Sequence, residues 1–432
     1  MGTVIVGGVG GNSQSGGIQN GHGMIVPRFG ASYRINDKTV VRSGFGITID
    51  PENLRNALNS YPANINLVQN GANNYVEGGD FVTGIPALPL PVISSAGTVP
   101  LPENLSTNAL PQNFRRGYIE SFNLSFQRQL PASFVANVAY AGTHAVRQQS
   151  NVNINAAPPG GGAAGRLLNT TYGANTNNTD LNASLPFRGS VYNGLQAQLS
   201  RTSSRFVSTG VIYTYSKAMD ISDNSTNSGL TFAYPTVWDR NWAAAGYDRP
   251  HNFQWWTVAP FPFGKGQAFL KDSFAGKLLG GWQVQTVMSK VSGTPFTVTA
   301  DGTTLNAPGN TQVADQLATR VQIYGAHHRS GSTNAITYFN TAQFAQPTGI
   351  RFGTAGRNSV RGPGYFNLDV GVKRTISIYE NLKLQLQGES FDVTNTPQFA
   401  NPSAAVNTPA SFGTITVSNA SRSLRLSARV IF

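Results

Sequence analysis

Apolar and polar residues alternate in many segments of this chain, and no other feature of the sequence constrains the fold as strongly. From Phe122 to Gln127 every even position is apolar and every odd position is polar. The last segment, from Leu424 to Phe432, keeps apolar residues on alternate positions to its final residue. Successive side chains of a β-strand point to opposite faces of the sheet, so each such segment predicts a strand with one apolar face. Helical periodicity is nearly absent, which predicts an all-β chain.

The alternation predicts 11 strands, which short and long connections join in turn. The strands span about 24–35, 38–50, 115–130, 133–146, 190–202, 205–217, 250–261, 280–299, 364–377, 381–394 and 421–432. Tight turns are expected at 36–37, 130–132, 203–204 and 379–380, with a medium-length turn at 262–279. The long connections are 51–114, 147–189, 218–249, 300–363 and 395–420, all rich in Asn, Thr, Pro, Gly and Ser.

Alternating connection lengths separate a membrane barrel from a compact soluble domain. Long structureless loops are uncommon inside a soluble domain, whereas outer-membrane barrels have short periplasmic turns and long extracellular loops. Charged residues make up only 12% of the chain, against about a quarter in typical soluble domains. The polar strand positions are mostly Asn, Ser, Gln, Thr and Gly, which suits a wet or plugged interior. Aromatic residues near the strand ends, such as Tyr33, Tyr140 and Tyr213, are typical of the girdles of a membrane barrel.

The predicted fold is therefore a transmembrane antiparallel β-barrel with long extracellular loops and short periplasmic turns. Bacterial single-chain barrels have an even number of strands, so the odd count of 11 indicates either that strands precede this segment or that one strand within it is not recognised. The start of the chain shows no signal peptide, which fits the same expectation of a fragment. We expect residues 1–23 to be a Gly-rich remnant of an extracellular loop. Residues 24–432 are expected to form the C-terminal part of the barrel.

Ten segments, in order along the chain, resemble one known family. They are Val26–Tyr33, Lys38–Ile47, Ser121–Leu130, Val138–His144, Asp248–Phe253, Phe261–Gly266, Gly280–Gln283, Ser292–Phe296, Gly362–Leu368 and Phe391–Pro397. Together they are similar to the TonB-dependent outer-membrane receptors of the Oar-like class. The resemblance covers about residues 24–432 and rests on the order of the segments, since each segment alone is a weak match.

The resemblance implies a barrel of about 22 strands with a plugged lumen, of which this chain would supply about 11 or 12. It also implies a location in the outer membrane of a Gram-negative cell envelope, in contact with outer-membrane lipid. Extracellular loops would capture an unknown ligand, and the TonB complex would act only through an N-terminal plug outside this chain. The resemblance implies no enzyme activity and no cofactor.

Two sets of residues are candidates for function. Alternate residues of the last strand resemble the signal read by the barrel-assembly machinery, although an ordinary last strand could also end in an aromatic residue. These residues are Leu424, Leu426, Ala428, Val430 and Phe432. In the long connection 218–249, Trp238, Arg240 and Trp242 could form an aromatic lip for a glycan or peptide ligand. The alternative, which we favour, is a loop that packs against its neighbours.

Other motifs do not carry a predicted chemistry. The pair His327-His328 lacks a carboxylate or cysteine at ligand spacing, and Gly7–Gly11 lacks the strand and helix of a nucleotide fingerprint. The net charge of +12 is spread singly along the chain, so no nucleic-acid partner is predicted. Basic residues on the polar face would either guide anionic ligands or contact a plug or other wall residues. They are Arg28, Arg34, Lys373, Arg425 and Arg429.

Two other functions remain open on the sequence alone. A secreted or surface-attached β-rich adhesion protein would usually show repeats, which are not found. A smaller passive porin would need an even strand count and its own signal peptide. An unclosed barrel would leave two sheet edges in lipid, so the chain expressed alone is predicted to aggregate.

Overall fold

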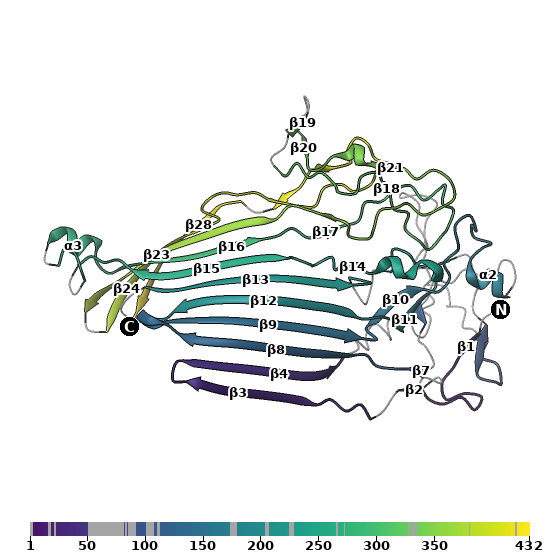
Figure 1. The fold of residues 1–432 in the computed structure, drawn as a ribbon, viewed down its shortest axis with the longest axis horizontal. Coiled ribbons are helices and arrows are strands. Elements are labelled where there is room, and N and C mark those ends of the chain that lie inside the picture. The colour runs from purple at the N-terminus through teal and green to yellow at the C-terminus, as the bar shows by residue number, and fades with distance from the viewer. Residues whose placement is uncertain are drawn as a thin grey trace.

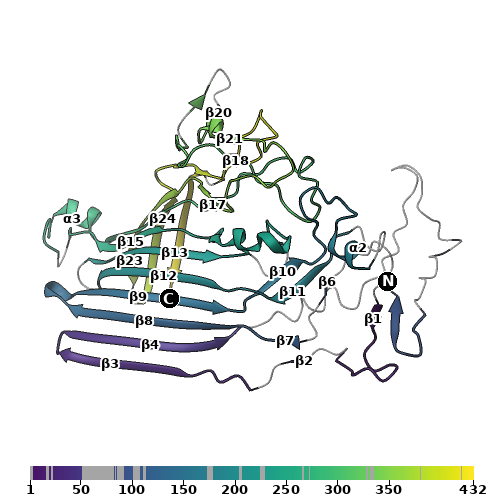
Figure 2. The same ribbon diagram turned by 45° about the vertical axis from the view of Figure 1, so that its right-hand side comes forward.

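The computed structural model describes a single curved antiparallel sheet with a cap at one end (Figures 1 and 2). It describes residues 3–15, 19–20, 23–50, 82, 84, 92–100, 108–109, 113–172, 179–203, 207–223, 229–264, 267–271, 273–326, 329–330, 335–379, 381–419 and 421–432. The main sheet has the order β28-β24-β23-β16-β15-β13-β12-β9-β8-β4-β3, with the short β14 paired to β13. Every neighbour along this path is the next long strand in the sequence.

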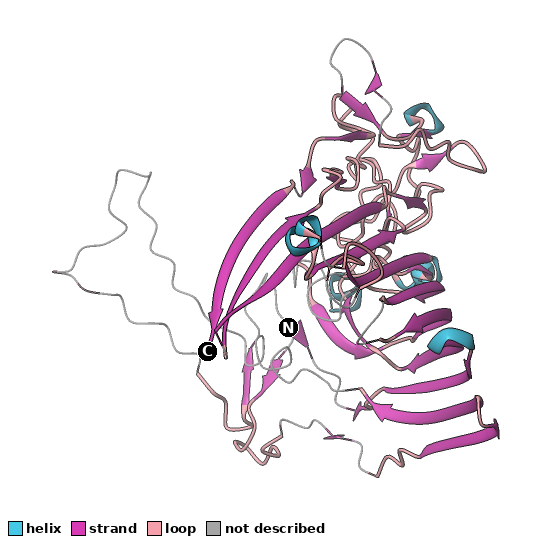
Figure 3. Ribbon diagram, turned by 90° about the vertical axis from the view of Figure 1, so that its left-hand side faces the viewer, coloured by secondary structure: helices cyan, strands magenta, loops and turns pink. Residues whose placement is uncertain are grey.

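All 11 predicted strands are present, ten of them with small shifts at their ends and one, predicted at 280–299, with an earlier end. They are β3 (Arg28–Asn36), β4 (Thr39–Ile49), β8 (Tyr118–Gln129), β9 (Phe134–Val146), β12 (Ser190–Arg201), β13 (Ser208–Asp220), β15 (His251–Pro260), β16 (Trp282–Val291), β23 (Tyr365–Tyr379), β24 (Leu382–Phe391) and β28 (Ser423–Ile431). The short β14 (Ala243–Ala244) was not predicted. We call this sheet the wall. Seen along its strands, the wall forms an open arc (Figure 3).

Short turns lie at one end of the wall and long connections at the other, as predicted (Figure 1). The turn between β8 and β9 contains Ala132 and Ser133, with φ of 56° and 61°. Positive φ at a tight turn matches the right-handed twist of the strands that it joins. The medium turn holds α3 (Phe274–Leu279), where the Ser273 side chain accepts a hydrogen bond from the Gly276 N–H. None of the helices in the described part of the chain is long and apolar enough to cross a membrane.

The register assigns each strand residue to one of two faces. Leu124, Tyr140, Leu195 and Tyr215 pair across four successive strands and form a row on one face. The adjacent positions form rows of amides and small polar residues on the opposite face; one such row pairs Gln127, Asn137 and Gln198. The alternation seen in the sequence thus separates an apolar face from a polar face across the whole wall.

The loop end of the wall carries ordered structure, which corrects the expectation of structureless loops. We call the described parts of 147–189, 221–250, 292–364 and 392–422 the cap. It contains α2 (Leu167–Tyr172), η2 (Pro235–Asn241), η3 (Thr341–Gln343), β10 (Gln149–Asn153), β11 (Asn182–Pro186), β17 (Pro295–Phe296), β18 (Asp315–Gln316), β19 (Arg329–Ser330), β20 (Ala335–Thr337), β21 (Phe344–Ala345), β22 (Val360–Arg361), β25 (Gln398–Phe399), β26 (Thr414–Ile415) and β27 (Ser418–Asn419). Five further short strands lie between the start of the chain and β8: β1 (Thr3–Ile5) pairs with β5 (Thr98–Pro100), β2 (Gln19–Asn20) with β7 (Asn113–Phe114), and β6 (Asn108–Ala109) with β11.

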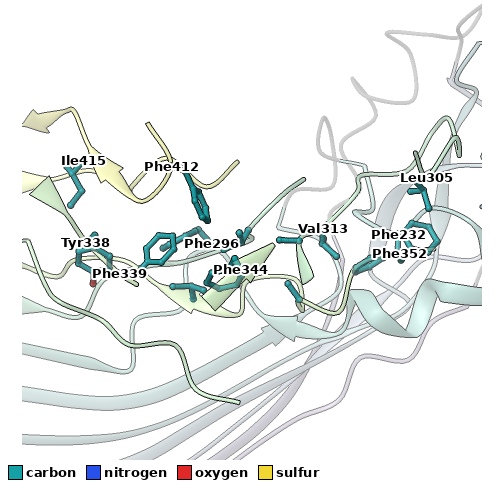
Figure 4. Close-up of a cluster of buried hydrophobic side chains, with 14 of the residues drawn as sticks. Phe232, Phe296, Leu305, Val313, Tyr338, Phe339, Phe344, Phe352, Phe412 and Ile415 are labelled. Carbon is teal, nitrogen blue, oxygen red and sulfur yellow. The ribbon is translucent and has the colours of Figure 1, made fainter. Parts of the chain in front are cut away.

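The cap has an aromatic core of its own (Figure 4). Phe339 is fully buried at its centre, with ring centroids 5.4 Å from Phe412 and 5.7 Å from Phe344. The core draws residues from three of the four cap connections. A second, smaller core joins Val152 to Ile221 and Leu230. Burial of apolar side chains stabilises these connections, and they are therefore ordered despite their loop-like composition.

One predicted strand is too long. The segment 280–299 was expected to be a single strand, but β16 ends at Val291 and the chain enters the cap. At Gly293 an added Cβ would lie 1.9 Å from the Gly362 carbonyl oxygen. This close crossing of two backbones requires glycine and redirects the chain. Pro295 then begins β17, which pairs with β22 inside the cap.

The wall is not closed. β28 and β3 are the two ends of the strand order, and in the described residues neither pairs with a further strand on its outer side. The C-terminus lies at the turn end of the wall (Figure 1).

Candidate functional site

The apolar face of the wall has the height of a membrane core. On β8 the outward positions between Glu120 and Arg128 hold Phe122, Leu124 and Phe126. Eight residues at about 3.3 Å per residue span about 26 Å along the strand, or about 20 Å across the membrane at a tilt of about 40°. Outer-membrane barrels carry an apolar band about 25 Å tall. This face is therefore the lipid-facing face, and the cap lies on the extracellular side.

Polar groups mark the extracellular rim of this band. The His144 Nδ1 lies 3.1 Å from a Glu120 carboxylate oxygen. The Tyr140 ring is level with Leu195 in the middle of the band, and its hydroxyl reaches toward the rim and donates to the Asn193 side chain at 2.5 Å. The Tyr213 hydroxyl lies 2.8 Å from the His251 Nδ1. Such amphipathic aromatic residues favour the level of the lipid headgroups. The contacts fix the height at which the wall sits in the membrane.

Arginines mark the periplasmic rim. The Arg201 guanidinium lies 5.6 Å from the Phe134 ring centroid. The Arg374 guanidinium lies 5.8 Å from the Trp282 ring centroid and donates to the Leu278 carbonyl at 3.0 Å. Arg374 therefore also holds α3 against the base of the wall.

The polar face carries the five basic residues that the sequence assigned to it. The register places Arg28, Arg34, Lys373, Arg425 and Arg429 on this face. Arg425 Nε donates to the Glu389 carboxylate at 2.6 Å, directly across the β24–β28 pair. Between β8 and β16 the described mid-strand positions of this face are mostly amides, hydroxyls and glycines. Charge on the polar face is thus concentrated toward the two edges of the wall.

The candidate assembly residues lie on the lipid-facing edge. Leu424, Leu426, Ala428 and Val430 alternate along β28, opposite Ser390, Gly388, Leu386 and Leu384 of β24. Leu426 is 88% exposed and the terminal Phe432 is 97% exposed. The edge strand therefore presents an unpaired backbone and an apolar row together.

Arg357 anchors the cap to the wall. Its guanidinium donates to the Asp220 carboxylate at 2.8 Å and to the Asn241 carbonyl at 2.9 Å, and it lies 2.8 Å from the Asp223 carboxylate. Arg357 and Asp220 are both almost completely buried. A buried arginine without its carboxylate would be strongly destabilising, so this pair ties the last cap connection before β23 to the end of β13.

Arg361 makes a second anchor four residues later. It donates to the Asp248 carboxylate at 2.5 Å and to the Gly293 carbonyl at 2.7 Å. The other Asp248 oxygen accepts the Ala218 N–H at 2.7 Å, and Asp248 is only 1% exposed. No periodic pattern in the sequence marks these anchors, because Arg357 and Asp220 are 137 residues apart. The one feature of the sequence that points to the anchors is the scarcity of carboxylates, of which Asp220 and Asp248 are two.

The three predicted ligand-contact residues lie together at η2, in different environments. Trp238 donates to the Ala233 carbonyl at 2.6 Å and packs edge-on against Phe187 at 4.7 Å. Arg240 donates to the Gly353 carbonyl at 2.6 Å and lies 4.2 Å from the Phe232 ring centroid. Trp242 is 41% exposed. Two of the three therefore support the cap internally, and one presents its ring to solvent.

Two titratable side chains in the cap have pKa values that are shifted by their surroundings. The Arg351 side chain donates to Asp315 at 2.6 and 2.8 Å and holds the pKa of that carboxyl below its usual value. Burial raises the pKa of Tyr338 to about 12. Among the residues that the structure describes, no group of His, Cys, Asp and Glu could hold a metal ion. The pair His327-His328 lies outside the described residues.

Three solved structures similar to this chain are a transporter and two receptors. The outer membrane transporter YddB from Escherichia coli has a TM-score of 0.49 at 9% identity, over 94% of this chain and 40% of that chain. The ferric-catecholate import receptor Fiu from Escherichia coli K12 has a TM-score of 0.40 at 11% identity, over 94% and 34%. The siderophore receptor PiuA from Acinetobacter baumannii has a TM-score of 0.41 at 12% identity, over 94% and 35%. The chain thus spans less than half the length of each of these proteins.

Sequence comparison assigns the family. No curated protein matches the chain at a significant level. The family model described as "Outer membrane beta barrel domain" matches residues 1–429, in agreement with the lipid-facing band, the alternating connections and the antiparallel order of the wall. This chain belongs to the outer membrane β-barrel domain family and is a protein of the outer membrane.

Proposed function

We propose that this chain is the C-terminal barrel wall and extracellular cap of a TonB-dependent receptor or transporter, which takes up or senses an extracellular ligand. The observation that supports this proposal most is the ordered cap, with its own aromatic core and two buried arginine anchors. Binding residues are commonly carried on loops that a rigid scaffold positions. An unselective open channel would not need such a cap over its mouth.

Each part of the chain has a role in this proposal. The cap captures the ligand, with Trp242 as an exposed contact and with Trp238 and Arg240 holding the loop behind it. The polar face of the wall lines the path inward. The barrel-assembly machinery recognises β28 through its alternate apolar residues and Phe432. The TonB complex acts through a plug that is not part of this chain, and no catalytic residue is assigned.

The proposal is tested with the full-length protein in its own cell. Three strains are compared: the wild type, a strain lacking this gene, and a strain lacking TonB. Depletion of solutes from the growth medium is followed by mass spectrometry. We expect at least one solute whose uptake needs both genes, and its uptake should fall when Trp242→Ala is introduced.

Other outcomes distinguish the competing functions. Uptake that needs this gene but not TonB, together with steady conductance of the purified protein in a planar bilayer, would identify a passive porin. Loss of surface attachment with unchanged uptake would identify an adhesion protein. Either result would overturn the receptor proposal while leaving the membership in the barrel family intact.

A further inference from the structure

We propose that the extracellular rim of the wall binds the phosphate of an anionic lipid headgroup between β13 and β16, through Lys217 and Lys290 with His251 between them. This inference rests on the lipid-facing wall and does not depend on the proposed receptor function.

The register places all three side chains on the lipid-facing side. His251 pairs with Tyr215, and Lys217 lies two residues beyond Tyr215 on the same face of β13. Lys290 pairs with Phe253 of β15 and Phe366 of β23, both in lipid-facing rows. Lys290 is one residue from the loop end of β16, and His251 is the first residue of β15. Lys290 is level with Tyr213, so Lys217 and Lys290 are two strands and four residues apart, or about 16 Å between their backbones at about 4.8 Å per strand and 3.3 Å per residue. His251 lies midway between them, and both lysine side chains must extend toward it to reach one headgroup.

The positive charge at this place is only partly neutralised by the protein. Among the described residues, no carboxylate lies within ion-pair distance of Lys290, which is exposed. The Lys217 ammonium lies 3.7 Å from an Asp248 oxygen that already accepts from Arg361 at 2.5 Å. Two cations thus share one carboxylate, and the Lys217 side chain is 53% exposed. On the same rim, the His144 Nδ1 lies 3.1 Å from a Glu120 carboxylate oxygen that no second basic side chain contacts among the described residues.

The surroundings of the lysines favour a lipid over a soluble anion. The Tyr213 hydroxyl holds the His251 ring, and the Tyr215 ring centroid lies 5.2 Å from that ring. Phe253 and Phe366 flank Lys290 on its row. The aliphatic stems can therefore lie along apolar surface while the ammonium groups reach the headgroup level. A charge left facing hydrocarbon is costly, whereas basic clusters beside a membrane attract anionic headgroups.

The test measures lipid retention by the full-length protein purified from outer membranes. Native mass spectrometry counts bound lipid after incubation with mixed micelles containing phosphatidylglycerol or phosphatidylcholine. We expect the wild type to retain phosphatidylglycerol preferentially. Because each basic residue near an anionic surface contributes about fivefold in binding, Lys217→Gln with Lys290→Gln should lower that retention by roughly 25-fold. The matched control is Lys373→Gln, which removes the same charge from the polar face and should leave retention unchanged.

The remaining outcomes decide against the proposal. Equal retention of the two lipids by the wild type would overturn it, as would an unchanged double variant. An equal loss in Lys373→Gln would indicate general charge attraction and not a site on this rim. Competition by millimolar inorganic phosphate would identify a free-phosphate site. Lys290→Gln alone replaces an exposed side chain, so its retention value, read alongside heat-modifiable migration in gel electrophoresis, separates loss of binding from loss of folding.

Discussion

The wall and the cap are each stabilised by a different kind of interaction. The wall exposes large apolar side chains, such as Leu426 and Tyr33, and its strands pair through backbone hydrogen bonds. The cap buries aromatic side chains such as Phe339 and encloses charged pairs such as Arg357 with Asp220. The wall therefore depends on lipid to cover its apolar face, while the cap follows the rules of a soluble domain. Loss of an aromatic ring should therefore destabilise the cap more than the wall, whereas an added charge on the lipid face should destabilise the wall.

The largest effect is expected from removing a buried anchor. Arg357→Ala would leave Asp220 and Asp223 without their cation, and breaking a buried pair typically costs about 3–5 kcal/mol. The cap should become sensitive to protease on intact cells while the wall strands stay protected. Arg351→Ala, which opens a partly exposed pair with Asp315, should have a much smaller effect. Equal protease sensitivity of the two variants would contradict the anchor role.

A core truncation should have a comparable effect, confined to the cap. Phe339→Ala removes a fully buried ring, and such a change typically costs about 3–5 kcal/mol. Urea titration with pulse proteolysis of the protein in detergent should show the cap unfolding earlier. The matched change in the wall is Phe126→Ala, at a side chain that is 43% exposed on the lipid face. If Phe126→Ala destabilised the cap as much, the two regions would not be separate.

A charged residue introduced on the lipid-facing side of the wall should destabilise the wall. Leu195 faces lipid in the middle of β12, and the next residue, Gln196, faces the interior. Arginine on the lipid face of a barrel costs about 2–4 kcal/mol near the membrane centre. Leu195→Arg should therefore lower the folded fraction seen as heat-modifiable migration, while Gln196→Arg should be tolerated. The reverse result would mean that the two faces have been exchanged.

The smallest effect concerns pH and the cap alone. Arg351 lowers the pKa of Asp315, so this pair stabilises the cap above the unfolded pKa of about 3.9. That contribution is lost as the pH falls through the lower folded pKa. Hydrogen exchange at β18 and β21 should be slower in the wild type than in Asp315→Asn at pH 5. The two proteins should converge near pH 2, and a difference that persisted there would point to another cause.

The sequence predicts the wall well because its information is local. In a strand such as β8, the alternation over six residues, from Phe122 to Gln127, is enough to predict the two faces. The connection lengths then predict the antiparallel order. The register of each pair then follows from matching the faces. The 11 strands, the orientation and the polar-face position of Arg425 could therefore all be stated in advance.

The cap could not be predicted because its information is not local. Phe232, Phe339 and Phe412 meet in one core from three connections, with no periodic spacing between them. Asn, Gly and Pro around them are typical of loops, and they hide the apolar residues from any short window. The candidate site shows the same limit: the position of Arg240 was visible in the sequence, but its carbonyl partner Gly353 is 113 residues away.

The two arginine anchors have a mechanical consequence. Arg357 and Arg361 lie on one segment that leads directly into β23. They bind Asp220 at the end of β13 and Asp248 just before β15. A force that lifts the cap would load these guanidinium bonds before it reached the aromatic core. The cap therefore cannot swing away as a rigid lid while the anchors hold. Under the proposed receptor function, movement that admits a ligand would have to occur in other cap segments, such as the paired strands β19 and β20, which stand apart from the strand ends of the wall (Figure 1).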